Sequence, residues 1–327
     1  CMAASEKDIQ TYTDTDFAMD TVVSETLYTT GDDINSKLTS VLTDVETNLL
    51  SWTNEKSQIY KVNADSGKDT EISEELSGYL ERLLKIAKDS DGAFDPTIGK
   101  LIRLWDIGGE NQRIPGEDEI QEVLKDSGYQ KISLDGNTIH MDEGCSLDLG
   151  AAGKGIGCDL ILENLKNQKD VTAALMNLGG SSVMTYGSKP DGSSWNVAVT
   201  DPRAENDDDY LGVVALNGTE FLSTSGDYEK YFIEDGVRYH HIMDPSTGYP
   251  AKSGVTGVTI VCDTGLEADA LSTACFVLGV EKGAQLLKTY GADGLFVDED
   301  HHVYLTEGMK ERFSLLADSY SVEDILE

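Results

Sequence analysis

The sequence predicts an α+β fold with a mixed, largely antiparallel sheet core flanked by helices. Helical patterns predominate before Gly128, and short strand-like runs predominate after it. Strands and helices do not alternate regularly, which argues against a doubly wound parallel sheet. No Pro/Ser-rich linker divides the 327 residues. We therefore expect a flexible N-terminal tether at residues 1–15 and a single domain at residues 16–327.

Two amphipathic helices are expected in the first part of the chain. The first covers residues 32–50, where an Asp-Asp start precedes apolar residues at helical spacing. Its apolar positions are Ile34, Leu38, Val41, Leu42, Val45 and Leu49. The second begins after the possible cap Ser73 and ends at the turn-forming segment 89–92. Its apolar positions are Leu76, Leu80, Leu83, Leu84 and Ala87.

Strands and hairpins are expected in the second part of the chain. Short apolar or alternating runs, many of them broken at Gly or Asp, occupy segments 131–142, 194–202, 211–226, 254–263 and 294–308. Two helical segments interrupt them, one at about 155–166 and one at about 266–290. The second of these is expected to break near Gly279.

The charge balance excludes some classes of partner. The chain has 25 Lys and Arg against 60 Asp and Glu, a formal net charge of −35. Such a surface repels polyanions, so we expect no nucleic-acid partner and no binding to a bare anionic membrane. The first residue is Cys1, and a small polar stretch follows it, which is typical of a lipidated cysteine and its tether. We expect an extracytoplasmic lipoprotein held at the membrane only through Cys1. The alternative is a cloning boundary that happens to fall at Cys-Met.

The other cysteines show no metal-binding spacing. Cys145, Cys158, Cys262 and Cys275 form no C-x-x-C motif and no Cys/His cluster. We expect buried packing residues. The alternative, in an exported protein, is a disulfide between two of them.

The densest group of chemically suggestive residues is the segment 147–159, LDLGAAGKGIGCD. Its small residues leave the backbone bare at the apparent start of a helix, where free N–H groups and Lys154 could meet a phosphate. The spacing is not that of a Walker A loop, because Gly155 stands where Ser or Thr would bind magnesium. The alternative is a tightly packed Gly/Ala turn.

Two other segments offer polar groups. Asp269 and Thr273 are four residues apart in an apolar helical pattern, so a carboxylate and a hydroxyl share one face and could hold Mg²⁺. The alternative is that Thr273 bonds to the backbone of its own helix and that Asp269 is an ordinary acid near a helix start. In segment 239–251, a histidine and Asp244 could manage a proton, or they could form an Asx turn with a structural histidine. His301 and His302 are expected in a solvated turn.

Aromatic residues suggest a flat ligand. Phe94, Asp95 and Trp105 come together around the turn of segment 92–105, and Trp52 follows the first long helix. Rings beside an acceptor suit stacking on a heteroaromatic group plus a hydrogen bond, although core packing is the alternative. The chain has no G-x-S-x-G motif, which argues against a nucleophilic hydrolase.

The order of these motifs resembles the ApbE family of FAD:protein FMN transferases. The resemblance runs through FAMDT at 17–21, GAFDPTIG at 92–99, LDLGAAGKG at 147–155, MNLGGS at 176–181, STSGDY at 223–228, HHIMDPSTGYP at 240–250 and ADALSTACFVLG at 268–279. It implies an ApbE-like fold and a transferase that moves the FMN moiety of FAD to a Ser or Thr hydroxyl of a target protein, with Mg²⁺ and release of AMP. Two alternatives are a Mg²⁺-dependent FAD pyrophosphatase and a non-enzymatic, exported FAD-binding lipoprotein.

The resemblance also assigns site residues. It places FAD against Met19, Trp52, Ala93, Phe94, Asp95, Asp148, Lys154 and Ile242. It gives Mg²⁺ the backbone carbonyl of Ala151 with Asp269 and Thr273, and it makes His241 the catalytic histidine, with Asp244 as the second candidate for the base. Trp52 stands where several relatives have Tyr.

The acceptor implied by the resemblance carries a D-G-x-x-[ST] motif. Five Asp-Gly segments of this chain have another residue in the last place: 91–95, 135–139, 191–195, 235–239 and 293–297. Self-modification is therefore not expected. The acceptor should be another protein, an exported membrane redox subunit or flavoprotein.

Overall fold

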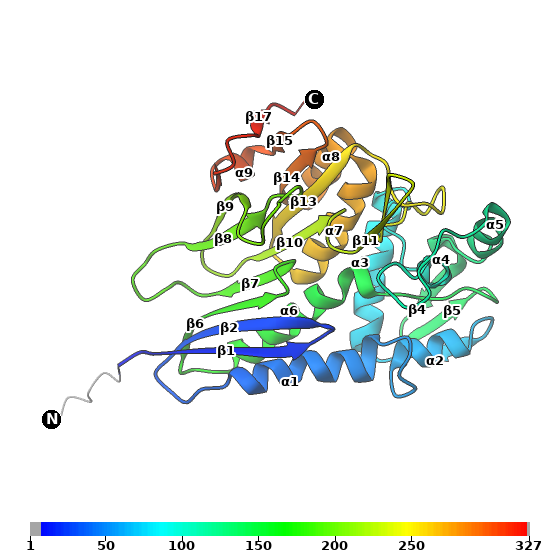
Figure 1. Ribbon diagram of the computed structural model, residues 1–327. Coiled ribbons are helices and arrows are strands. Elements are labelled where there is room, and N and C mark those ends of the chain that lie inside the picture. The colour runs from blue at the N-terminus through cyan, green and yellow to red at the C-terminus, as the bar shows by residue number, and fades with distance from the viewer. Residues whose placement is uncertain (1–7, 326–327) are drawn as a thin grey trace.

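The computed structural model describes residues 8–325 and is organised around one large sheet (Figure 1). The nine strands of this sheet lie in the order β1 (Gln10–Ala18), β2 (Thr21–Thr29), β6 (Val171–Leu178), β7 (Ser182–Tyr186), β10 (Phe221–Gly226), β13 (Val255–Cys262), β14 (Asp293–Asp298), β15 (His302–Leu305) and β17 (Ser321–Glu323). Neighbouring strands are antiparallel except β15 and β17, which are parallel. The predicted α+β class with a largely antiparallel sheet is confirmed.

Three small sheets accompany the large one. They are β16 (Phe313–Leu315) with β9 (Tyr210–Leu216) and β8 (Trp195–Thr200); β3 (Asp69–Glu71) with β5 (Thr138–Met141) and β4 (Ile132–Asp135); and the hairpin of β11 (Tyr231–Glu234) and β12 (Val237–His240). Every segment predicted as a strand or hairpin contains at least one strand of the large sheet or of these small sheets.

The helices are α1 (Asn35–Val45), α2 (Gln58–Ala64), α3 (Glu74–Asp89), α4 (Gly99–Trp105), α5 (Glu117–Leu124), α6 (Gly150–Lys166), α7 (Gly265–Leu278), α8 (Val280–Tyr290) and α9 (Glu307–Lys310). A π-helical turn, Glu46–Leu50, continues α1, and a 3₁₀ turn, Tyr129–Lys131, precedes β4. The expected cap at Ser73 is confirmed, because its hydroxyl accepts the Leu76 N–H at 3.1 Å. The expected break at Gly279 separates α7 from α8.

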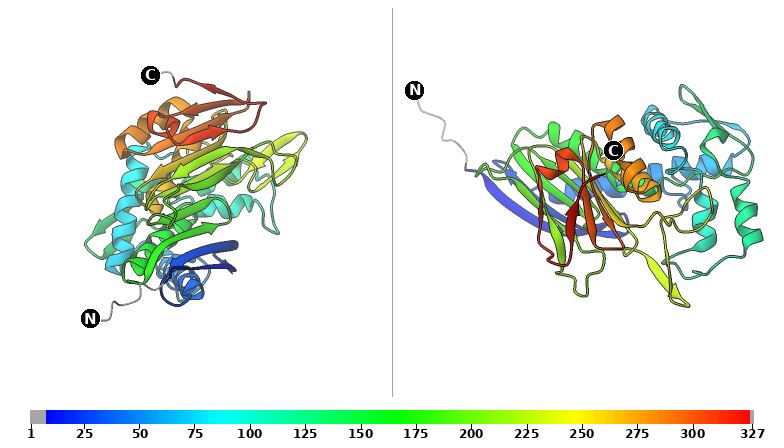
Figure 2. Two further views of the ribbon diagram at one scale, coloured as in Figure 1. Left: turned by 90° about the vertical axis from the view of Figure 1, so that its left-hand side faces the viewer. Right: turned by 90° about the horizontal axis from the view of Figure 1, so that it is seen from above.

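The central strands of the large sheet are buried on both faces. Helices gather on one side of it, as the left view of Figure 2 shows, while β8 and β9 cover part of the other side. Along β13, Val258 and Ile260 belong to the helix-side core and Val261 belongs to the core under β8 and β9. This arrangement explains why β13 is apolar on both faces and carries no polar alternation.

A lobe beside the sheet carries α4 and α5 (Figure 1). Trp105 is fully buried there with Ile120 and Met243, and its indole N–H donates to the carbonyl of Gly248 at 2.8 Å. Trp105 is therefore a core residue, as the packing alternative predicted. Cys145, Cys158, Cys262 and Cys275 are buried free thiols, so they pack rather than form disulfides.

The expected tether is too long. Residues 10–15 belong to β1, where Gln10 pairs with Thr29 and Thr15 with Ser24. The prediction failed because an edge strand with few buried side chains reads as a polar coil in the sequence. Residues 1–7, which include Cys1, lie outside the described residues. Within residues 8–325, no helix has the length and apolarity needed to cross a bilayer.

Candidate functional site

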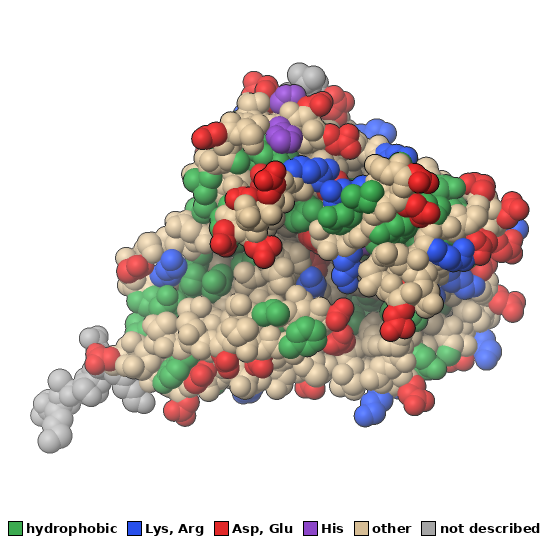
Figure 3. Space-filling model, in the orientation of Figure 1, with side chains coloured by type: hydrophobic (Ala, Val, Ile, Leu, Met, Phe, Trp, Pro, Cys, Tyr) green, Lys and Arg blue, Asp and Glu red, His purple; other side chains and the backbone are tan. Residues whose placement is uncertain are grey.

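A pocket of about 510 Å³ opens between the large sheet and the lobe of α4 and α5. Figure 3 shows this face of the molecule hollowed, with Lys or Arg side chains visible at the hollow despite the acidic surface around it. Its walls come from the start of α6, the middle of α7, the ends of β7 and β10, and the loops at 93–98 and 241–243. The size is in the range of small-molecule and cofactor sites.

The floor of the pocket is a close crossing of α6 and α7. A Cβ on Gly155 would lie 1.9 Å from the carbonyl oxygen of Gly265, and one on Gly265 would lie 2.2 Å from that of Gly155. No side chain fits at either position. Asp159 of α6 also accepts the N–H groups of Gly265 and Leu266 at 2.7 and 2.9 Å, which fixes the start of α7. The sequence of α6 thus sets where α7 begins.

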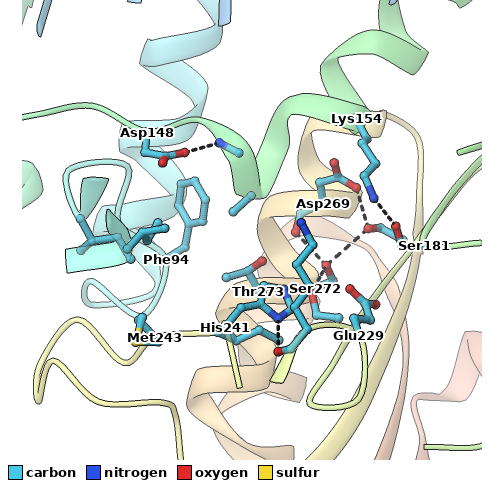
Figure 4. A pocket seen from close by; sticks show the side chains of 18 of the residues that line it. Phe94, Asp148, Lys154, Ser181, Glu229, His241, Met243, Asp269, Ser272 and Thr273 are labelled. Atoms are coloured by element: carbon cyan, nitrogen blue, oxygen red, sulfur yellow. Dashed lines mark hydrogen bonds between the residues drawn. The ribbon is translucent and has the colours of Figure 1, made fainter. Parts of the chain in front are cut away.

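Asp269 projects from α7 into this floor and is 7% exposed (Figure 4). Its Oδ1 accepts hydroxyl hydrogen bonds from Ser182 at 2.8 Å and Ser223 at 2.6 Å, and its Oδ2 accepts the Gly155 N–H at 2.6 Å. Burial raises the pKa of the Asp269 carboxyl, while these hydrogen bonds oppose the rise. Oδ2 keeps lone-pair capacity for a further partner.

The three residues expected to hold Mg²⁺ all line the pocket: Ala151, Asp269 and Thr273. Their carbonyl, carboxylate and hydroxyl oxygens are the hard donors that Mg²⁺ prefers. The Gly155 N–H, which a regular helix would pair with the Ala151 carbonyl, donates to Asp269. The Ala151 carbonyl therefore competes with Asp269 for the Gly155 N–H. A lone pair of this carbonyl oxygen is available to bind a cation. The residues present fit a magnesium ion.

Lys154 is a cationic side chain that acts electrostatically on Asp269, and its ammonium group donates to the Ser181 hydroxyl at 2.7 Å. It lines the pocket together with Lys230. The glycines around it serve packing as much as access, because a Cβ on Gly157 would lie 2.7 Å from the side chain of Leu42. The Gly/Ala alternative is thus correct for Gly155 and Gly157, whereas Ala151 and Lys154 face the pocket.

His241 lines the pocket, and its Nδ1 lies 3.3 Å from the backbone carbonyl of Lys230. A carbonyl can only accept, so the Nδ1 carries the proton and Nε2 keeps its lone pair. Desolvation lowers the pKa of His241 to about 4, so the imidazole is neutral at pH 7. A neutral histidine with a free Nε2 is equipped to accept a proton from a substrate.

Asp244 is not part of this pocket. Its Oδ1 accepts the N–H and the hydroxyl of Ser246 at 2.9 and 2.7 Å, as in an Asx turn, and its side chain lies at a separate depression. The second candidate for the base therefore lies outside the pocket that His241 lines. The turn chemistry of Asp-Pro-Ser-Thr-Gly is the physical reason, because it commits the carboxylate to its own backbone.

The lobe side of the pocket is apolar and aromatic. Trp52, Ala93, Phe94 and Ile242 line it, as expected for a wall against a flat ring. Trp52 is 43% exposed, and the Arg103 guanidinium lies 4.7 Å from its ring centroid.

Two expected ligand carboxylates lie on the same side but are bound to the protein. Asp95 accepts hydrogen bonds from the backbone and hydroxyl of Thr97 and from the Tyr129 N–H. Asp148 accepts the Gly150 N–H at 2.8 Å. Burial raises the pKa of both carboxyls. Both line the pocket, so each can meet a ligand only with the lone pairs that these bonds leave free.

Met19 does not line the pocket. Its side chain packs behind α6, where its terminal methyl lies 3.6 Å from a Cβ built on Gly153. The glycines of α6 leave a groove that Met19 fills, which is why a residue expected at the ligand supports the helix. Its neighbour Asp20, in the turn between β1 and β2, does line the pocket.

Several pocket residues were not singled out in the sequence. They are Ser181, Ser182, Ser223, Ser225, Glu229 and Ser272. Ser223 and Ser225 lie two residues apart on β10, so both face α7, where the Ser225 and Ser272 hydroxyls are 2.8 Å apart. Serines with the period of two that a strand has were the available signal. Ser182 had none, since only folding brings it to Asp269.

Comparison with known proteins places this geometry in a family. The sequence profile of the ApbE family matches residues 19–296. An FAD:protein FMN transferase of Treponema pallidum is 35% identical over 292 residues, covering 84% of this chain and 80% of the relative. A protein of the same name from Klebsiella pneumoniae is 34% identical over 284 residues, covering 84% and 86%.

Solved structures agree. The crystal structure of the ApbE protein of Thermotoga maritima superposes with a TM-score of 0.83 at 34% identity, covering 93% of this chain and 99% of that one. The apo form of the Pseudomonas stutzeri flavinyl transferase ApbE gives a TM-score of 0.81 at 29% identity, covering 94% and 98%.

Proposed function

Because this chain belongs to the ApbE family of flavin transferases, we propose that it moves the FMN moiety of FAD to a Ser or Thr hydroxyl of a separate protein, in a Mg²⁺-dependent reaction that releases AMP. One observation carries the proposal. A buried carboxylate, Asp269, and a lysine, Lys154, share the floor of a pocket whose opposite wall is aromatic. That arrangement suits a ligand with a pyrophosphate at one end of a flat ring system.

The charges of the pocket support this ligand. A pyrophosphate carries two negative charges into a protein of net charge −35, so positive charge must be concentrated where it binds. Lys154 supplies one charge there, and the N–H groups of the first turn of α6 supply partial charge. A magnesium ion held by Ala151, Asp269 and Thr273 would neutralise pyrophosphate oxygens and the departing phosphate.

In the proposed reaction each pocket residue has a separate role. Trp52 and Phe94 orient the flavin, and Lys154 holds a phosphate oxygen. The Nε2 of His241 takes the proton of the acceptor hydroxyl as its oxygen bonds to the phosphorus of the FMN moiety. The bond between that phosphorus and the bridging oxygen breaks, and AMP leaves with the electron pair. The serine hydrogen bonds to Asp269 keep the floor fixed throughout.

The test uses the purified chain with FAD, MgCl₂ and an acceptor protein that contains a D-G-x-x-[ST] motif. We expect the acceptor to gain the mass of one FMN less one water, because a phosphoester forms, and AMP to appear in equal amount. The chain itself should gain no mass, because its own Asp-Gly segments lack the acceptor residue. AMP with free FMN, and no labelled acceptor, would identify an FAD pyrophosphatase instead.

A pair of variants isolates the role of the floor. Asp269→Ala should abolish transfer with Mg²⁺ as the only divalent ion, while equilibrium dialysis still detects some bound FAD. Asp263→Ala is the matched control, because Asp263 is an exposed acid two residues before α7. Full transfer by Asp269→Ala would refute the assigned metal site.

A further inference from the structure

Glu25 is a buried carboxylate of the β1/β2 hairpin that does not line the pocket. It lies on β2 and is only 2% exposed. Its Oε1 accepts the hydroxyl hydrogen bond of Thr39, a residue of α1. Its Oε2 is buried and has no hydrogen-bond partner. A carboxylate oxygen left bare inside a protein costs several kcal/mol in principle, so an unseen partner is expected.

Two more carboxylates face the same point. Asp14 lies directly opposite Glu25 in the β1/β2 ladder, and Asp16 follows two residues later on the same side of β1. Ligand oxygens of Asp14, Asp16 and Glu25 all lie within 4.8 Å of one another. Two oxygens on opposite sides of a Ca²⁺ ion, each at 2.3 to 2.6 Å, would be about 5 Å apart at most. The spacing therefore leaves room for one ion among them.

Three carboxylates act electrostatically on Glu25: Asp14, Asp16 and Asp33. Like charges held this close repel one another unless a cation or a proton lies between them. A divalent cation held by all three carboxylates offsets two of their charges, whereas a single shared proton offsets one.

A second oxygen without a partner lies on α1, the helix that carries Thr39. Asn35 of α1 is 1% exposed, and its Oδ1 is buried without a hydrogen bond. Asn35 stands one turn before Thr39, and its Nδ2 donates to the carbonyl of Tyr12, two residues before Asp14. The contact surface between α1 and the hairpin thus holds more oxygen acceptors than donors, a composition typical of a cation site and unlike an ordinary core.

We propose that Asp14, Asp16 and Glu25 bind a divalent cation, with Ca²⁺ as the preferred ion, between the β1/β2 hairpin and α1. Calcium suits this set because it accepts several carboxylates in irregular geometry, whereas Mg²⁺ requires a near-ideal octahedron. The site is separate from the pocket, and its existence does not depend on the transfer reaction. It would fix the hairpin whose turn carries Asp20 to the pocket.

The experiment is a calcium titration of chelator-treated protein, without FAD, by isothermal titration calorimetry and differential scanning calorimetry at pH 7.5. Wild type should bind one more Ca²⁺ per chain than Glu25→Gln. The part of the Tm rise that belongs to this site, about 5 °C at a hundredfold excess over its Kd, should be missing in that variant. Any calcium bound at Asp269 contributes equally to both proteins.

The matched control is Asp44→Asn, which removes one exposed negative charge from α1 outside the cluster. It should keep the stoichiometry and the Tm rise of wild type. If far-UV circular dichroism shows that Glu25→Gln does not fold, Asp14→Asn replaces it, because Asp14 is exposed. We expect Asp14→Asn to weaken this site at least tenfold.

Three results would overturn the proposal. One is equal calcium stoichiometry and equal Tm rise in wild type and Glu25→Gln. Another is an equal loss of binding in Asp44→Asn, which would make the effect one of bulk charge. The third is no calcium binding in wild type beyond the ion that Asp269→Ala removes, which would leave the three carboxyl groups sharing protons.

Discussion

At the floor of the pocket, α6 and α7 touch through bare backbone at Gly155 and Gly265, and Asp269 is held by three hydrogen bonds. At the rim, Trp52 is 43% exposed and is held by the stacked guanidinium of Arg103. The floor is fixed by contacts that no other residue could replace, whereas the rim is fixed by side chains that can repack. Substitutions at the floor should therefore remove function, and those at the rim should weaken binding.

The largest effect is expected for Gly155→Ala. The new methyl group would overlap the Gly265 carbonyl, so the two helices must separate. We expect a loss of about 3 kcal/mol or more in the free energy of unfolding, measured with urea, together with loss of transfer. Gly78→Ala is the control, because its Cβ meets nothing within 4 Å on the exposed side of α3. It should stabilise the protein by roughly 0.5 to 1 kcal/mol. Equal behaviour of the two variants would contradict the close crossing.

His241→Ala tests the chemistry above the floor. Loss of the proton acceptor should lower the rate of transfer by roughly 10²- to 10⁴-fold. FAD affinity, measured by equilibrium dialysis, should change little, because the histidine acts on the acceptor. A rate within a few-fold of wild type would remove His241 from the mechanism.

Trp52→Ala tests the rim. Loss of one stacking face should raise the KM for FAD by roughly 5- to 20-fold and leave kcat nearly unchanged. Trp52→Tyr should restore most of the affinity, since a tyrosine ring can also stack. A large fall in kcat with an unchanged KM would show that the rim takes part in the chemical step.

The pH dependence of transfer should be shallow. With a pKa of about 4, about nine tenths of His241 is neutral at pH 5, whereas an ordinary histidine would be almost fully protonated there. The single-turnover rate should fall less than twofold between pH 8 and pH 5, and then steeply below pH 4. Folding stability follows the same group: the unfolded histidine takes up its proton near pH 6.5, so stability declines as the pH drops from there towards 4. A half-loss of rate near pH 6.5 would contradict a desolvated His241.

Asp244→Asn should have the smallest effect. Asparagine can keep the Asx-turn hydrogen bond to the Ser246 N–H, and the side chain lies outside the pocket. We expect kcat and KM within twofold of wild type. A hundredfold loss of kcat would return Asp244 to the role of base.

The sequence predicted the fold class, the helices α1, α3, α6, α7 and α8, and the pocket residues that show helical spacing. Asp269 and Thr273 were found because one helical face presents both. Ser182 and Asp20 were not predictable, since sheet pairing and a turn bring them to the pocket from remote segments. Met19 and Asp244 lie outside the pocket lining for local reasons that the pattern did not show: Met19 packs against the glycines of α6, and Asp244 bonds within its own turn.

The hydrogen bonds from Gly265 and Leu266 to Asp159 have a mechanical consequence. Neither helix can slide along or swing away from the other without breaking both bonds and the backbone contact between them. The two helices that carry Lys154 and Asp269 therefore behave as one rigid body. The floor of the pocket therefore keeps its shape while an acceptor protein approaches it.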